Sequence, residues 1–302
     1  MQARNAVRLG PLVALAGAVV LVASACGFGF GPPALDSNGP RLQTQARAAL
    51  DRWSAAVAAG HGSDLVPVDE LVGQIGDWEA TAGDNKAALM AGVVEAAITL
   101  PGDTPPDGPV TWSDGTSESV ALIPAANALV DIRTAGAGSC DGCVPLRVTG
   151  SRLTTASIRT SRGPATVPVW AFTVDGTAVQ VTRVAVANMV IPVPPPWDPN
   201  NAPVGLSIDV AKGTADGRDL GVTFIGAPGP ASQGCGADYT AEAVESDTAI
   251  VVIVHEHSNP GGGACALVGA TRTASVTLAS PLGKRAVLEI KEGRPVPVTL
   301  GP

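Results

Sequence analysis

Glycine and proline recur along almost the whole chain, and their density limits how long any regular element can run. The 302 residues include 36 glycines and 26 prolines, about a fifth of the total. Proline lacks a backbone N–H and glycine weakens both helices and strands, so both residues mark turns. We therefore expect many turns and short strands rather than long helices.

The composition excludes several classes of protein. Apolar residues make up 45% and charged residues 15% of the chain, which favours packed domains over disorder. A net charge of −8 argues against a nucleic-acid partner, because phosphate contacts need a basic surface. We exclude a collagen, a coiled coil, a polytopic membrane protein and a DNA-binding protein on these grounds.

The N-terminus predicts export and lipid attachment. Arg4 and Arg8 precede a short apolar stretch that ends in small residues directly before Cys26. This pattern is typical of a lipoprotein signal peptide over residues 1–25, cleaved before Cys26, whose thiol then carries the lipid. We expect the mature protein on the extracytoplasmic face of the cell membrane, held there by this lipid.

Two alternatives for the N-terminus stay open. Residues 23–25 read Ala-Ser-Ala, which also fits the cleavage site of a plain secretory signal. An uncleaved helix is the other alternative, although the apolar stretch is shorter than the roughly 20 residues that span a bilayer.

Residues 26–40 are rich in glycine and proline and predict a flexible tether. The acidic body should not bind anionic lipid, so we expect the membrane contact to be the lipid alone or the lipid plus a partner.

The pattern along the mature chain predicts a mainly β protein of the α+β class. One helix is expected over residues 41–60, where apolar residues recur at spacings of three and four. Alternating runs separated by turns such as Asp175-Gly176 predict hairpins. Residues 86–100 favour a strand over a helix, and residues 127–134 predict a further short strand.

Proline content suggests where the chain divides. Residues 190–203 contain six prolines and Trp197, which predicts an extended linker. We expect a helix-plus-β-rich domain over residues 41–189 and a small β-sandwich-like domain over residues 204–302. Trp197 is interpreted as packing the linker onto a domain, with an anchor for a binding partner as the alternative.

The cysteine count predicts disulfides. Setting Cys26 aside leaves four cysteines, which default to disulfides in an oxidising compartment. Among the three possible pairings we favour Cys140 with Cys143 and Cys235 with Cys265, because each keeps its partners within one β-rich region. Thiol–disulfide exchange at the C-x-x-C motif and a four-cysteine zinc site are the alternatives.

Several segments resemble uncharacterised lipoproteins of high-GC Gram-positive (actinobacterial) bacteria. The resemblance rests on residues 76–79, the Cys140–Cys143 motif, residues 160–165 leading into 169–170, residues 235–239 and residues 281–285. It implies an envelope location. It carries over no activity and no catalytic or binding residue.

Few residues offer catalytic chemistry. The chain contains no G-x-S-x-G, S-x-x-K, P-loop or H-E-x-x-H motif. His255 and His257 would share one face of a strand, so both imidazoles could reach one metal ion. A third ligand, such as Glu245 or Asp247, would have to be brought close by the fold. The alternative is that His255 and His257 are polar residues at the end of a strand and bind no metal.

The sequence therefore favours a non-enzymatic envelope lipoprotein that acts as a binding or interaction module, without a cofactor. Its partners would be the membrane, through the lipid, and an envelope protein or ligand of unknown identity, but no nucleic acid. A metal-dependent hydrolase or metal-binding protein using His255 and His257 is the first alternative. Thiol–disulfide exchange at Cys140 and Cys143 is the second.

Overall fold

The computed structural model describes residues 38–79, 83–259 and 264–301. Its composition, 39% strand and 16% helix in three sheets, confirms the predicted mainly β, α+β fold. The lipidation, signal-peptide and most of the tether predictions lie outside the described residues. Among the residues described, no helix is both long and apolar enough to cross a membrane.

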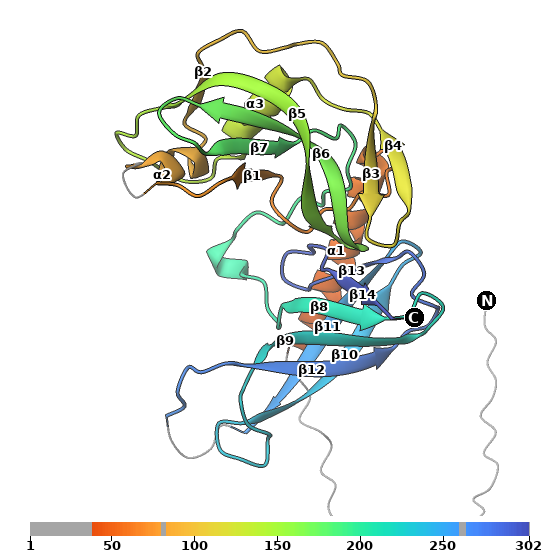
Figure 1. The fold of residues 1–302 in the computed structure, drawn as a ribbon. Coiled ribbons are helices and arrows are strands. Elements are labelled where there is room, and N and C mark those ends of the chain that lie inside the picture. The colour runs from red at the N-terminus through yellow and green to blue at the C-terminus, as the bar shows by residue number, and fades with distance from the viewer. Residues whose placement is uncertain (1–37, 80–82, 260–263, 302) are drawn as a thin grey trace, which may run out of the picture. The chain divides into compact units, whose positions relative to one another are not determined.

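Residues 72–184 form a seven-stranded sheet with two helices (Figure 1). The strands follow the order β1-β7-β6-β3-β4, with β5 pairing on the other side of β6 and β2 pairing with β5. The elements are β1 (Val72–Ile75), α2 (Asn85–Met90), β2 (Val94–Ala96), β3 (Gly108–Trp112), β4 (Ser117–Val120), α3 (Ala125–Ala135), β5 (Leu146–Thr160), β6 (Gly163–Val174) and β7 (Gln180–Val184). The predicted hairpin around Asp175-Gly176 is present as the antiparallel pair β6–β7.

The strand predicted over residues 127–134 is wrong, because this segment is the helix α3. Ala125, Ala128, Leu129 and Ile132 are all buried in the core of the first sheet. Their spacing of three and four residues is the helical period, which the short β-branched stretch obscured. The region 86–100 holds both predicted alternatives, since α2 is followed by β2.

Residues 204–302 contain two sheets that share one core. One sheet has the order β10-β11-β13 and the other β12-β9-β8-β14. Apolar side chains from both sheets form a single buried cluster, as a sandwich requires. The strands are β8 (Ile208–Gly213), β9 (Asp219–Gly226), β10 (Ala237–Glu245), β11 (Ala249–Ser258), β12 (Ala270–Thr277), β13 (Ala286–Leu288) and β14 (Val298–Leu300), and a single-turn 3-10 helix, η1, spans Pro199–Asn201.

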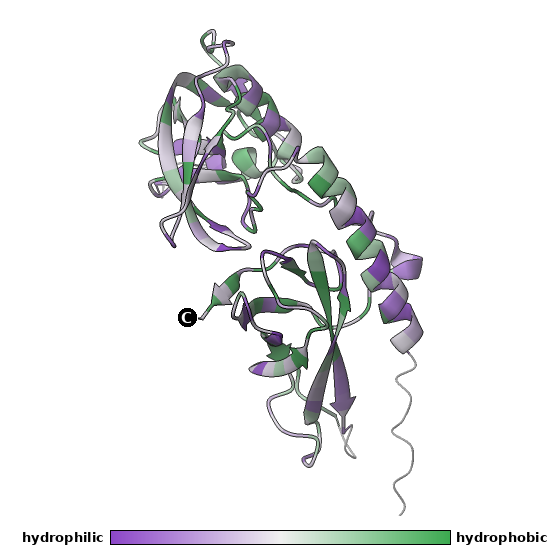
Figure 2. Cartoon of the chain, turned by 90° about the vertical axis from the view of Figure 1, so that its right-hand side faces the viewer, coloured by the Kyte–Doolittle hydropathy of each residue, from purple (hydrophilic) through white to green (hydrophobic). Residues whose placement is uncertain are grey.

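The helix α1 (Gly39–Ala59) confirms the predicted helix and covers the free face of β11. Side chains of β11 alternate between two clusters: Ile250, Val252 and Val254 face the second sheet. Val251 and Ile253 instead share a cluster with α1, whose own buried residues are Leu42, Ala46, Ala49, Trp53 and Ala56. Figure 2 shows both hydrophobic and hydrophilic residues along α1, as a helix with one buried face requires.

This packing differs from the predicted grouping of the helix with residues 41–189. Trp53 Nε1 donates a hydrogen bond to Thr248 Oγ1 at 3.2 Å, directly before β11. The apolar faces of α1 and β11 pack against each other. No sequence pattern predicts which strand the apolar face of a helix will pack against. The boundaries of the two predicted domains remain a prediction.

Candidate functional site

His255 and His257 both lie on β11, and each imidazole has its own partner on β10. His255 Nε2 lies 2.9 Å from Glu242 Oε1, an oxygen that also accepts a hydrogen bond from Gln43 Nε2 at 2.9 Å. His257 Nε2 lies 2.9 Å from Thr240 Oγ1. In both cases the partner is a diagonal neighbour across the strand pair rather than the residue directly opposite.

Glu245, one of the two carboxylates considered as a third metal ligand, is engaged elsewhere. Glu245 Oε2 pairs with Arg285 Nη1 at 2.6 Å, and Glu245 Oε1 accepts from Ala279 N at 2.6 Å. No three His, Cys, Asp or Glu side chains gather into a metal-holding group in the described parts of the chain. Metal binding by the histidine pair stays a prediction that this geometry does not favour.

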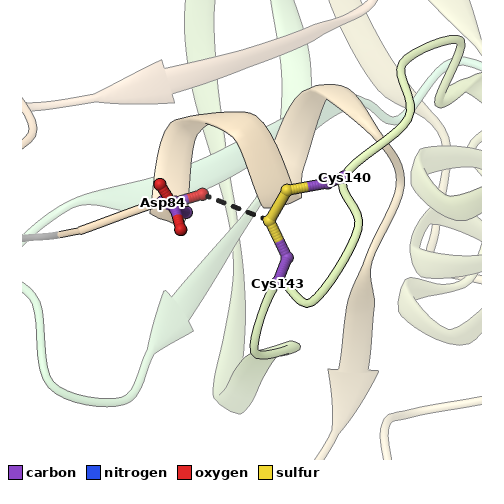
Figure 3. Close-up of a disulfide and its surroundings, with 3 residues drawn as sticks. All are labelled: Asp84, Cys140 and Cys143. Carbon is purple, nitrogen blue, oxygen red and sulfur yellow. Dashed lines mark hydrogen bonds between the residues drawn. A yellow bond between two sulfur atoms is a disulfide. The ribbon is translucent and has the colours of Figure 1, made fainter.

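The pairing Cys140–Cys143 is present as a disulfide in a turn beside α2, as Figure 3 shows. Cys143 Sγ lies 4.0 Å from the backbone carbonyl oxygen of Asp84. A disulfide sulfur carries no hydrogen, so this is a contact. After reduction the same oxygen, together with the acidic Asp141 of the motif, would disfavour a thiolate. The surroundings therefore support a structural disulfide more than an exchange site.

The pairing Cys235–Cys265 is also present, with 5.5 Å between the Cα atoms. It joins the segment that leads into β10 to the loop that follows β11. Both disulfides thus have the pairing that the sequence favoured.

The proline-rich segment contradicts the expected packing of Trp197. Trp197 is 75% exposed and Val193 is 73% exposed, whereas Pro192 is buried and Pro195 is half-buried. Pro192 and Pro195, three residues apart, are the residues of 191–197 that are not exposed. Polyproline II has three residues per turn, and proline fixes φ near its value. The segment meets the body along one edge, which leaves Trp197 on the outside.

An open depression of about 380 Å³ lies between this segment and the turn before β14. One wall is apolar, and the other carries three charged side chains. The residues that line it are Pro194, Pro195, Pro196, Trp197, Ala202, Pro203, Lys291, Glu292 and Arg294. Arg294 Nε pairs with Glu292 Oε2 at 2.5 Å.

The charged wall is held in place by a buried carboxylate. Glu289, 8% exposed, accepts backbone N–H groups from Lys291 at 2.8 Å, Glu292 at 2.6 Å and Arg294 at 3.3 Å. Three such bonds fix the turn without using the side chains that line the depression. Sequence reasoning missed this wall, since 291–294 carries no motif.

The helix α1 fixes the end of the proline-rich segment. Arg41 Nη2 donates to the Ala202 carbonyl oxygen at 2.6 Å and to Asn201 Oδ1 at 3.0 Å. Gln45 Nε2 donates to both the Val204 and the Ile290 carbonyl oxygens, at 3.0 and 2.8 Å. The amide of Gln45 thus ties the segment to the strand end from which the charged wall projects.

Comparisons with known proteins identify no relative. No protein-family model, no curated protein and no solved structure matches the chain. The resemblance to actinobacterial lipoproteins therefore stays an expectation from the sequence.

Proposed function

We propose that the protein is a lipid-anchored, non-enzymatic binding protein of the cell envelope that contacts a partner protein through residues 191–197 and the adjoining depression. The observation that carries the proposal is the exposure of Trp197, 75%, at the end of a proline-rich run. An exposed tryptophan at the mouth of a depression is the kind of residue on which binding energy concentrates.

The rigidity of the segment supports this role. Binding orders side chains and loops, which costs free energy that weakens the complex. Residues 191–197 include four prolines, whose φ angles are already fixed, and tryptophan has only two side-chain torsions. The apolar side chains Ile191, Val193 and Trp197 are therefore presented with little entropy left to lose.

The charged wall would fix the orientation of the bound partner. Lys291, Glu292 and Arg294 stand across the depression from Trp197. Polar groups around an apolar centre are the usual anatomy of a protein interface, and they set orientation more than affinity. Extended proline-rich segments are also a recurring form of protein recognition.

The membrane part of the proposal rests on Cys26. With Cys26→Ser we expect loss of lipid attachment, so that the body partitions into the aqueous phase of a detergent extraction. Retention in the detergent phase by a cleaved chain would contradict lipid anchoring.

The binding part is tested by placing a photo-crosslinking amino acid at position 197 in cells. The matched control carries the same group at Leu267, which is 106% exposed on a separate loop. We expect a discrete protein adduct from position 197 and none from position 267. The same adducts from both positions, or none from 197, would contradict the proposed surface.

A further inference from the structure

One long strand of the first sheet has a free edge, and this feature is independent of the proposed function. The strand β5 pairs with β6 along one side over most of its length. On its other side it is paired only near its two ends. At one end β2 pairs with residues 146–148, and at the other Val68 N donates to the Arg159 carbonyl oxygen at 3.0 Å.

Prolines in β6 show which backbone groups of β5 point outward. Thr155 lies opposite Pro168 and Arg159 lies opposite Pro164. Proline has no N–H, so neither pair can be a hydrogen-bonded pair, and the residue facing it turns its own N–H and C=O to the outer edge. The bonds of Arg159 agree: its N–H donates to Asp69 Oδ2 at 2.8 Å on that side.

The same alternation makes four consecutive odd-numbered residues face outward: Ser151, Leu153, Thr155 and Ser157. Within the described residues, none of their eight backbone N–H and C=O groups has a hydrogen-bond partner. Natural edge strands are protected by proline, lysine or other charges, but residues 151–157 contain only one charge, Arg152. Leu153 is 41% exposed on the outer face. The free backbone groups of this edge can therefore pair with another strand.

We propose that this edge pairs with the same edge of a second copy of the chain, antiparallel, about a two-fold axis at Thr154. In this register Ser151 faces Ser157 of the second copy, and Leu153 faces Thr155 of the second copy. All four outward residues of each copy then meet outward residues, so every free group finds a partner. The interface gains eight hydrogen bonds.

Side chains fit this register. Thr154 faces Thr154 of the second copy, and threonine pairs across strands are favourable. Arg152 faces Ala156 of the second copy, so no like charges oppose each other. Because one symmetric contact uses both free edges, the assembly stops at two copies. A strand edge is a small interface, so the dimer dissociates on dilution.

Cross-linking tests the two-fold axis. Facing residues of a non-hydrogen-bonded pair have Cα atoms about 4.5 Å apart, within disulfide range. The full chain with Thr154→Cys should therefore form a covalent dimer under mild oxidation. The matched control is Ser157→Cys, whose symmetry mate would lie six residues further along the strand, and it should stay monomeric. Equal cross-linking of both variants, or none of Thr154→Cys, overturns the proposal.

A proline variant tests the outward hydrogen bonds. Thr155→Pro removes a donor from the outer edge and none from the pairing with β6. We expect sedimentation equilibrium to show a dimer dissociation constant about tenfold or more higher than that of the parent. Thr155→Val keeps the N–H and should match the parent.

The remaining outcomes all count against the proposal. If the parent is monomeric at every concentration, the proposal fails, even if another protein's strand occupies the edge in cells. If Thr155→Pro dimerises as well as Thr155→Val, strand pairing is not the contact. Thermal melts show whether Thr155→Pro is folded; if it is not, the Thr154→Cys and Ser157→Cys pair decides.

Discussion

Two apolar stretches of similar length differ in their burial: residues 249–254 are buried, whereas residues 191–197 are largely exposed. In β11, residues 249–254 are at most 2% exposed, whereas Val193 and Trp197 of the segment 191–197 are 73% and 75% exposed. The difference lies in the backbone. Residues 249–254 have all their N–H groups; residues 250–254 pair with β10, and residues 249–251 pair with β13 on the other side. Four of the seven residues of the second run are prolines, which lack the N–H groups that strand pairing uses.

Both faces of β11 are buried because the second sheet covers one face and α1 covers the other. Once β10 and β13 flank β11, its even-numbered residues face the second sheet and its odd-numbered residues face α1. In the segment 191–197, by contrast, Pro192 and Pro195 are the residues that are not exposed. Hydrophobicity alone therefore does not predict the core of this protein; the available hydrogen-bond donors decide.

The largest effect should come from a cavity in β11. Ile253 is 0% exposed and lies between β11 and α1. We expect Ile253→Ala to lower the free energy of unfolding by about 4 kcal/mol, measured by urea denaturation. Val193→Ala in the exposed run is the control and should change it little. A similar loss in both variants would remove the contrast.

The next effect concerns the ion pair that joins the two strands flanking β11. Glu245 ends β10, and Arg285, whose side chain is 9% exposed, directly precedes β13. Burial tends to raise the pKa of Glu245, but the Ala279 N–H and the Arg285 guanidinium outweigh it, and its pKa lies below its usual value. We expect Glu245→Gln to cost about 3 kcal/mol at neutral pH, because it leaves a largely buried guanidinium unpaired.

The same pair sets a pH dependence. Because the folded pKa is lowered, the stabilisation is complete above the unfolded value of about 4.3 and disappears as the pH falls through the folded pKa. Urea denaturation of the parent across this range should therefore show stability decreasing towards acid. The variant Glu245→Gln should lose less stability over the same interval; an identical pH profile would show that the pair is not responsible.

A smaller effect is expected where the apolar run of β11 ends. The side chain of His255 is 17% exposed and bonded to Glu242, which also binds Gln43 of α1. His255→Ala should cost about 1 kcal/mol of unfolding free energy. His257→Ala, at the more exposed end, should stay within about 0.5 kcal/mol of the parent. The two thermal melts would separate a packed histidine from a surface one.

The smallest effect on stability belongs to Trp197. Because its side chain lies outside the core, Trp197→Ala should change the free energy of unfolding by less than about 0.5 kcal/mol. The same variant should remove most of the solvent-exposed component of tryptophan fluorescence, since Trp53, Trp112 and Trp170 are buried and Trp78 is half-buried. A large loss of stability would place Trp197 in the core and contradict its exposure.

Local patterns predicted the elements that carry strong periodicity. The helix at 41–60 and the Asp175-Gly176 hairpin each depend on neighbours within a few residues. The helix α3 was missed because its short β-branched stretch resembles a strand. The sequence of residues 127–134 fits both a strand and a helix. The packing of Leu129 and Ile132 in the core of the first sheet favours the helix.

The candidate site depends on residues that are far apart in the sequence, so it was harder to predict than these elements. The wall formed by Lys291 and Arg294 faces Trp197 across almost a hundred residues of chain, and no motif connects them. The bond between His255 and Glu242 requires the register of β10 and β11. Register depends on the whole hairpin, so neither arrangement could be derived from composition or spacing.

The position of α1 has a consequence for the order of folding. Trp53 lies 195 positions before its partner Thr248, and the cluster that buries the apolar stripe of α1 includes residues of β11 and β13. Contacts this distant in sequence slow folding, since the chain must close a long loop before they stabilise it. During synthesis or export, α1 emerges early and keeps its stripe exposed until almost the last strand has followed. The first helix of the described residues is therefore among the last to be fully packed, and a chain that stops before β11 leaves its stripe without the residues of β11 and β13.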